Sequence, residues 1–239
     1  MCFTTLVGSW TYLKTLGLGA IFIGDNVYLV FRADNFKCPE NMTHHLKKVF
    51  EGEYDIPVNT TKSVPGMRIL DVGANCGAFT LWAYHRWPLC KIESYEPHPE
   101  SFKLLKENTD TLWCVGKHNV AVGNPGVKIL YNGVNNLGEA TLKEASGGAS
   151  FTGQHVNVIS PLEMPIADIL KMDTEGCEVE ILEPLIDAGR EFRAVMFEYH
   201  SINDRRKLDR LLMDYVLIGS EVYTPGRGVM KYVHRSEIK

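Results

Sequence analysis

A buried strand that runs directly into a glycine-rich turn constrains the fold of this chain more than any other feature. Residues 69–77 read ILDVGANCG, and an apolar segment of helical character begins at Ala78. Glycines in such a turn let the backbone fold sharply and let a ligand lie against it without meeting a Cβ atom. The free N–H groups at the start of the following helix favour a carboxylate or a phosphate. The pattern therefore predicts a βαβ unit with a ligand site where its first strand ends.

Strands and helices alternate along most of the remaining chain. Apolar runs predict strands over 67–72, 91–96, 117–122, 168–173 and 194–199, and helices over 78–87, 99–109, 178–188 and 204–213. This alternation predicts a parallel sheet with helices on both faces, which is a doubly wound, Rossmann-like α/β fold. Residues 215–223 and 229–234 flank a Pro-Gly-Arg-Gly turn and predict a C-terminal antiparallel hairpin.

The N-terminal part of the chain does not follow this alternation. Two β-branched and aromatic runs, 21–23 and 27–31, flank a Gly-Asp-Asn turn and predict a hairpin. A polar stretch with proline and glycine at 60–66 is typical of a connection. We therefore expect a small N-terminal cap, residues 1–65, and a main domain, residues 66–239.

Two segments carry weaker patterns. Apolar residues recur at helical spacing after Asn41, so a short helix is expected there. Farther along, residues 127–131 predict an additional strand, and the glycine-rich residues 147–151 predict a surface loop.

Composition narrows the class of protein. The formal net charge is −4, and no basic cluster is visible, which disfavours a nucleic-acid partner. Six cysteines without a C-x-x-C pair indicate reduced thiols rather than a zinc site or a disulfide framework. Apolar runs stay shorter than the roughly 18 residues of a membrane span, and the N-terminus lacks the pattern of a signal peptide. These observations predict a cytoplasmic protein without a membrane span.

A carboxylate follows at the end of the next predicted strand. Glu96 lies about 20 residues beyond Gly77, where dinucleotide-binding folds place an acidic residue that accepts hydrogen bonds from ribose hydroxyls. A solvated charge at a strand end would explain Glu96 alone. Together with the glycine turn one βαβ unit earlier, however, it favours an adenine nucleoside cofactor.

Two nucleoside cofactors fit this arrangement. A nicotinamide dinucleotide calls for G-x-G-x-x-G, but Asn75 occupies the place of the middle glycine. An acidic residue, Asp71, stands two residues before Gly73, which suits an amino or sulfonium group better than a pyrophosphate. The pattern favours S-adenosylmethionine, with S-adenosylhomocysteine as product. An NAD(P)-dependent oxidoreductase and a non-catalytic nucleoside-binding module stay open as alternatives.

Several ordered motifs resemble the FkbM family of class I S-adenosylmethionine-dependent methyltransferases. They are ILDVGANCGAFTL, YEPHPESFKLL, KHNVAVG, LKMDTEGCEVEIL and MFEYH, preceded by FEGEY. The resemblance implies a seven-stranded sheet and methyl transfer, usually to a hydroxyl oxygen of a sugar, a polyketide or a related metabolite. It implies a cofactor site that includes Asp71, Gly73, Asn75, Gly77 and Glu96, with Asn119 and Ala121 near the adenine. Tyr54, from FEGEY, and Glu175 complete the expected cofactor residues.

Carboxylates and a histidine mark the ends of two later predicted strands. Asp173 and Glu175 follow one strand, and Glu198 and His200 share one side of the other. Because carboxyl ends of parallel strands meet at one edge, we expect these groups to converge. Histidine is the usual base at neutral pH, so His200 or Asp173 is predicted to accept the proton of an acceptor hydroxyl.

Two other readings of these groups stay open. Capping of the following helix would explain one of the acidic residues. Alternatively, Asp173, Glu198 and His200 would hold a divalent cation that activates the hydroxyl. The expected acceptor is a small molecule or a glycan, and a homodimer is one assembly we consider.

Overall fold

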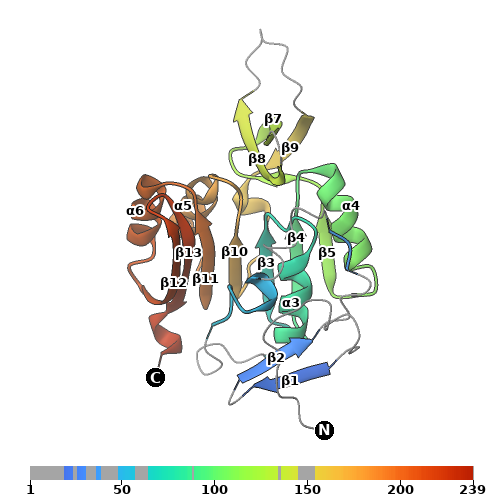
Figure 1. The fold of residues 1–239 in the computed structure, drawn as a ribbon. Coiled ribbons are helices and arrows are strands. Elements are labelled where there is room, and N and C mark those ends of the chain that lie inside the picture. Colours follow the sequence, from blue (N-terminus) through green and yellow to red (C-terminus); the bar gives the residue numbers. More distant parts are fainter. Residues whose placement is uncertain are drawn as a thin grey trace.

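A computed structural model describes most of the chain, and its arrangement is shown in Figure 1. The described residues are 19–23, 26–30, 36–38, 48–56, 64–87, 89–133, 136–144 and 154–238. Within them, no helix is both long and apolar enough to cross a membrane.

A seven-stranded mixed sheet forms the centre of the molecule, in the order β12-β13-β11-β10-β3-β4-β5. Its strands are β3 (Arg68–Val72), β4 (Lys91–Tyr95), β5 (Val115–His118), β10 (Ile169–Met172), β11 (Ala194–Tyr199), β12 (Tyr215–Thr224) and β13 (Arg227–His234). The strands from β5 to β11 in this order run parallel, and β13 and β12 follow as an antiparallel hairpin. The chain winds outward from β3 in both directions, which confirms the predicted doubly wound α/β sheet.

Helices cover both faces of this sheet. Alternate residues of a strand point to opposite sides, so a strand that is apolar throughout must be covered on both faces. The helices are α3 (Ala78–Arg86), α4 (Pro99–Asn108), α5 (Glu178–Asp187) and α6 (Ile202–Leu211). Leu70 and Val72 pack on one face with Leu182 of α5. Their neighbour Ile69 packs on the other face with Trp82 of α3. The predicted helices of the main domain are confirmed to within a few residues at their ends.

One predicted strand, over residues 117–122, is wrong in its extent. The segment contributes to two strands in different sheets: β5 ends at His118, and β6 (Ala121–Val122) belongs to a second sheet. Between them, the side-chain amide of Asn119 donates to the carbonyl oxygens of Glu96 and Pro97, at 2.8 and 3.1 Å. These bonds hold the chain against the end of β4, and the apolar pattern does not mark the break.

The second sheet has four strands in the order β6-β9-β7-β8 and lies at the carboxyl edge of the main sheet (Figure 1). Its longer strands are β7 (Gly126–Gly133), β8 (Asn136–Glu144) and β9 (Gln154–Ile159). β7 confirms the strand predicted over 127–131, whereas β8 and β9 are additional to the prediction. The loop predicted over 147–151 lies outside the described residues.

The N-terminal hairpin is confirmed as β1 (Gly19–Ile23) paired antiparallel with β2 (Asn26–Val30). Residues 48–50 are helical, and the rest of the helix expected after Asn41 lies outside the described residues. Tyr54 and Ile56 are buried in the core on the α3 face of the main sheet. The division of the chain at residue 65 stays a prediction.

Candidate active site

The glycine turn after β3 passes closely against the end of the neighbouring strand β10. Gly73 has φ +75°, and a Cβ atom there would lie 1.9 Å from the backbone oxygen of Asp173. The backbone N–H groups of Gly73 and Ala74 both donate to the carbonyl oxygen of Tyr95, at 3.0 Å each. Gly77, at φ +89°, precedes the first residue of α3. Glycine is therefore required at Gly73 because two strand ends meet there.

This turn forms one wall of an open pocket whose empty volume, including space continuous with solvent, is about 640 Å³. The pocket lies at the carboxyl edge of the sheet, where open α/β folds bind their ligands. Its lining residues are Val72, Gly73, Asn75, Tyr95, Glu96, Pro97, Val120, Ala121, Val122, Leu130, Asp173, Thr174, Glu175 and Cys177. Leu130 belongs to β7, so the second sheet contributes an apolar side chain to the pocket wall.

The Glu96 carboxylate is held in this pocket by two backbone N–H groups. Asn75 N donates to Oε2 at 2.7 Å, and His98 N donates to Oε1 at 2.8 Å. The side chain is buried, and burial raises the pKa of Glu96 to about 7, although the two N–H groups and the charge of Lys171 act in the opposite direction. Each oxygen keeps a lone pair for a further donor.

The raised pKa of Glu96 predicts a pH-dependent contribution to stability. The folded chain binds this proton more tightly than the unfolded chain, whose carboxyl group has a pKa near 4.5. The free energy of unfolding contributed by Glu96 is therefore largest below pH 4.5 and falls as the pH rises through 7. Glu96→Gln removes this dependence, so the variant should gain stability relative to wild type between pH 5 and pH 8. Urea unfolding at both pH values measures the difference, with the exposed Glu183→Gln as control.

Asp71 is not among the residues that line the pocket, and its part in the cofactor site stays a prediction. It is fully buried, and its Oδ1 forms an ion pair with Lys171 Nζ at 3.0 Å. Its Oδ2 accepts a hydrogen bond from Thr80 Oγ1 at 2.6 Å. Lys171 in turn donates to the carbonyl oxygen of Gly73 at 2.8 Å. Lys171 thus links Asp71 to the glycine turn.

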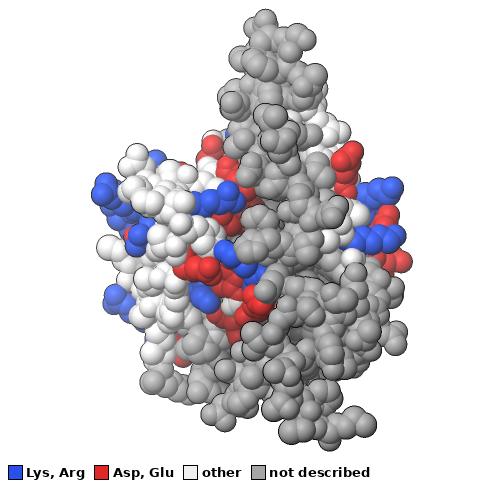
Figure 2. All heavy atoms as spheres, in the orientation of Figure 1, with Lys and Arg blue, Asp and Glu red and all other residues white. Residues whose placement is uncertain are grey.

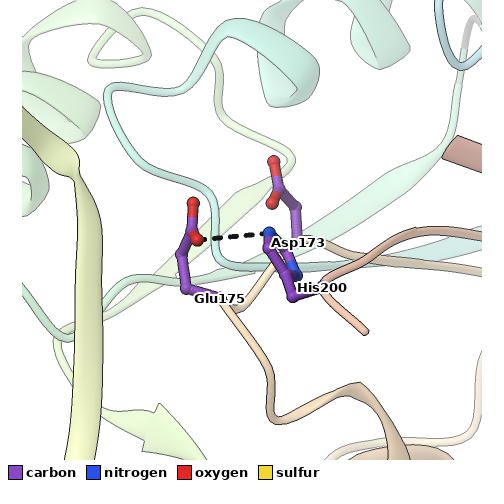
Figure 3. Close-up of side chains that lie close together, drawn as sticks. All are labelled: Asp173, Glu175 and His200. Carbon is purple, nitrogen blue, oxygen red and sulfur yellow. Dashed lines mark ion pairs between the residues drawn. The ribbon is translucent and has the colours of Figure 1, made fainter. Parts of the chain in front are cut away.

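Beside the pocket, acidic side chains converge with a histidine, as the sequence predicts. Asp173, Glu175 and His200 each offer an atom within 4.8 Å of the others (Figure 3). Acidic and basic side chains also gather near the middle of the face seen in Figure 2. Glu198 is turned toward Arg227, which also contacts Glu175 at 3.2 Å. Glu198 Oε1 lies 3.7 Å from His200 Nε2, so Glu175 approaches the histidine more closely than the Glu198 of the expected cation set does.

His200 lies between two carboxylates. Its Nε2 is 3.2 Å from Glu175 Oε2, and its Nδ1 is 3.2 Å from Glu178 Oε1. Burial by itself lowers the pKa of His200, but the two carboxylates raise it to about 11. An imidazolium has no lone pair for a proton, so this geometry favours Asp173 over His200 as a base.

The other predicted residues lie behind the pocket wall. The Tyr54 hydroxyl donates to Asp173 Oδ2 at 3.4 Å, and Asn119 supports the backbone at Glu96. The residues that the sequence argument missed are Lys171, Glu178 and Arg227. Lys171 lies within the motif LKMDTEG, but its partner becomes visible only when β10 is paired with β3.

A doubly wound seven-stranded sheet with an antiparallel C-terminal hairpin and a pocket at its carboxyl edge defines a class I methyltransferase architecture. Comparison with known sequences gives the family. The Methyltransferase FkbM domain matches residues 71–221, and the chain belongs to this family.

Two curated relatives are distant. Hexuronic acid methyltransferase AglP of Haloferax volcanii is 24% identical over 155 residues, which cover 60% of this chain and 60% of that protein. Methyltransferase sdnD of Sordaria araneosa is 24% identical over 185 residues, covering 61% of this chain and 71% of that protein. The chain therefore spans about three fifths of the length of AglP.

Two solved structures share less sequence identity with this chain than the two curated relatives do. A putative methyltransferase, yhhF, from Escherichia coli has a TM-score of 0.49 at 14% identity, covering 83% of this chain and 90% of that one. Precorrin-6y C5,15-methyltransferase from Geobacter metallireducens has a TM-score of 0.47 at 12% identity, covering 84% and 95%. The fold is defined by the strand order of the main sheet rather than by these similarities.

Proposed function

We propose that this protein transfers a methyl group from S-adenosylmethionine to a hydroxyl oxygen of a sugar or a related small metabolite. The observation that carries the proposal is the Glu96 carboxylate, fixed in the pocket by the N–H groups of Asn75 and His98. A carboxylate with a free lone pair on each oxygen suits two adjacent ribose hydroxyls.

The remaining pocket residues fit the other parts of the cofactor. Val120, Ala121 and Leu130 provide an apolar wall suited to an adenine ring. The Oδ1 atom of Asn75 is buried and has no hydrogen-bond partner among the described residues, so a ligand donor would satisfy it. When bound, the cofactor supplies an activated methyl group.

Asp173 is the residue we assign to the acceptor. It lines the pocket and accepts a hydrogen bond from the Tyr54 hydroxyl, which orients the carboxylate. Burial first, and then the charge of Asp173, raise the pKa of Tyr54 well above its ordinary value, so Tyr54 stays a donor. Asp173 can therefore take the proton of an acceptor hydroxyl as the oxygen attacks the methyl group.

The charge of the pocket wall bears on the acceptor. Asp173 and Glu175 both line it, and Glu175 is paired with Arg227 and His200. The charge of Asp173 disfavours an anionic group close to the reacting oxygen. AglP is named a hexuronic acid methyltransferase, which supports a sugar as the class of acceptor. We therefore propose an uncharged hydroxyl region of a sugar or a similar metabolite.

Calorimetry with S-adenosylhomocysteine, NAD⁺ and ATP tests the cofactor. We expect binding of S-adenosylhomocysteine, weakened about 10–100-fold in Glu96→Ala, because hydrogen bonds to a charged group contribute roughly 1.5–3 kcal/mol. Glu100→Ala, an exposed change in the first turn of α4, is the matched control and should bind as wild type does.

Each other outcome points to a different function. Binding of NAD⁺ that depends on Glu96, without binding of S-adenosylhomocysteine, would favour the oxidoreductase alternative. Binding of S-adenosylhomocysteine without methyl transfer to any hydroxyl acceptor would favour a nucleoside-binding module.

A further inference from the structure

We infer that Asp173, Glu175 and His200 form a binding site for one divalent cation at the edge of the pocket. One atom of each residue lies within 4.8 Å of the other two, and the residues come from the ends of two adjacent strands, β10 and β11 (Figure 3). His200 Nε2 and Glu175 Oε2 are 3.2 Å apart. Two ligands at right angles around an octahedral ion, each at roughly 2.1 Å, would be about 3 Å apart.

The two ring nitrogens of His200 are buried and make no hydrogen bond among the described residues, and each faces a carboxylate. The Nδ1 atom faces Glu178 Oε1 at 3.2 Å, which leaves Nε2 directed at Glu175. Metal-binding histidines commonly donate their other N–H to a carboxylate, which sets the tautomer and the direction of the ring. Glu178 therefore has the place of a supporting residue behind the ligand set.

Glu178 is itself rigidly held. It is fully buried at the start of α5, and its Oε1 accepts hydrogen bonds from the backbone N–H and the hydroxyl of Thr174, at 3.0 and 3.1 Å. Its Oε2 is buried without a hydrogen-bond partner among the described residues. A buried carboxylate oxygen without a partner is costly, and a divalent charge nearby lowers that cost.

The local charges favour a cation. Four carboxylates lie near His200: those of Asp173, Glu175, Glu178 and Glu198. The guanidinium of Arg227 contacts two of them, Glu175 and Glu198. Arg227 contacts Oε1 of Glu175, so the other oxygen, Oε2, stays directed at His200. Glu175 also adopts φ +54°, a strained conformation for a residue other than glycine.

The donor set indicates which cations suit the site. Two carboxylates and one imidazole suit Mn²⁺, Fe²⁺ or Zn²⁺ better than Mg²⁺, which prefers oxygen ligands alone. Asp173 and Glu175 line the pocket, so open coordination positions would face it. There the ion would bind the acceptor hydroxyl and ease loss of its proton, a role that rests on the proposed methyl transfer.

Titration of Mn²⁺ into the EDTA-treated full chain, without any nucleoside, tests the site. Free Mn²⁺ gives a sharp electron paramagnetic resonance signal that is lost on binding, so the method counts bound ions directly. We expect one site per chain, and at least about tenfold weaker binding in Asp173→Asn and in Glu175→Gln. Glu183→Gln, an exposed change on the same helix as Glu178, should bind as wild type does.

Pulsed measurements of the same samples test the histidine. Coupling of Mn²⁺ to an imidazole nitrogen should be present in wild type and lost in His200→Gln. The inference is overturned if the wild-type chain binds no Mn²⁺ at up to millimolar concentration, or if Asp173→Asn and Glu175→Gln bind it unchanged. Either result would leave His200 as an ion-paired imidazolium only.

The outcome is independent of the proposed function. Nucleoside binding without Mn²⁺ binding would remove the cation site and leave the methyltransferase proposal standing. Mn²⁺ binding without binding of S-adenosylhomocysteine would support the cation site and contradict the methyltransferase proposal.

Discussion

Replacing Gly73 by alanine is expected to abolish nucleoside binding and to lower the free energy of unfolding by about 3 kcal/mol or more. The added Cβ atom would lie 1.9 Å from the oxygen and 2.7 Å from the carbon of the Asp173 backbone, both far inside van der Waals contact. Backbone at the end of a paired strand cannot move aside cheaply. The glycine turn and the loop that carries Asp173 would therefore separate, and both line the pocket.

Gly66→Ala is the matched control for this prediction. Gly66 has φ +84°, close to the +75° of Gly73, but a Cβ atom there would meet no heavy atom within 4 Å. It should therefore show only the cost of the left-handed backbone, roughly 1–2 kcal/mol, and leave nucleoside binding intact. Urea unfolding and calorimetry measure both quantities. Equal losses of stability in the two variants would contradict the close approach of β3 and β10.

The parts of this molecule that could be predicted from sequence are those that depend on local pattern. The strand before Gly73, the helix after Gly77 and the carboxylate of Glu96 all follow from neighbouring residues and the geometry of one βαβ unit. The convergence of Asp173 with His200 followed from a single further rule, that parallel strands end at the same edge. Local chemistry and one rule of topology were sufficient there.

The contacts that the sequence does not reveal join partners that are distant along the chain. Asp71 was assigned to the cofactor by its place two residues before Gly73, and nothing in the sequence indicates that β10 pairs with β3 in the register that places Lys171 directly beside it. Glu198 likewise meets Arg227 only because β13 returns antiparallel along β11. A single sequence does not contain these registers.

Of the second sheet, only β7 was predicted as a separate strand, and the others were missed for a different reason. β9 does carry an alternating signal, since Val156 and Val158 are buried and His155 and Asn157 are exposed. The signal spans only a few residues, and β6 is just two residues long. Short strands such as these are defined by the pairing they enter rather than by their own composition. This sheet nevertheless supplies Leu130 to the pocket wall.

The buried ion pair between Lys171 and Asp71 leads to the second large effect. We expect Lys171→Met to lower the free energy of unfolding by about 3–5 kcal/mol, because it leaves the Asp71 carboxylate buried without its cation. Burial alone would lower the pKa of Lys171, but the charges of Asp71 and Asp173 raise it, so the ammonium is retained in the fold. The exposed Lys91→Met should change stability by only about 0.5 kcal/mol.

A double variant separates the two tasks of Lys171. Asp71→Asn combined with Lys171→Met removes both charges and keeps an oxygen for the hydroxyl of Thr80, so much of the lost stability should return. The single variant Lys171→Met and the double variant both lack the hydrogen bond from Lys171 to the Gly73 carbonyl oxygen, so nucleoside affinity should stay low in both. Wild-type affinity in the double variant would show that Lys171 only neutralises Asp71. Low affinity in a chain of recovered stability would show that it also positions the turn against which the cofactor lies.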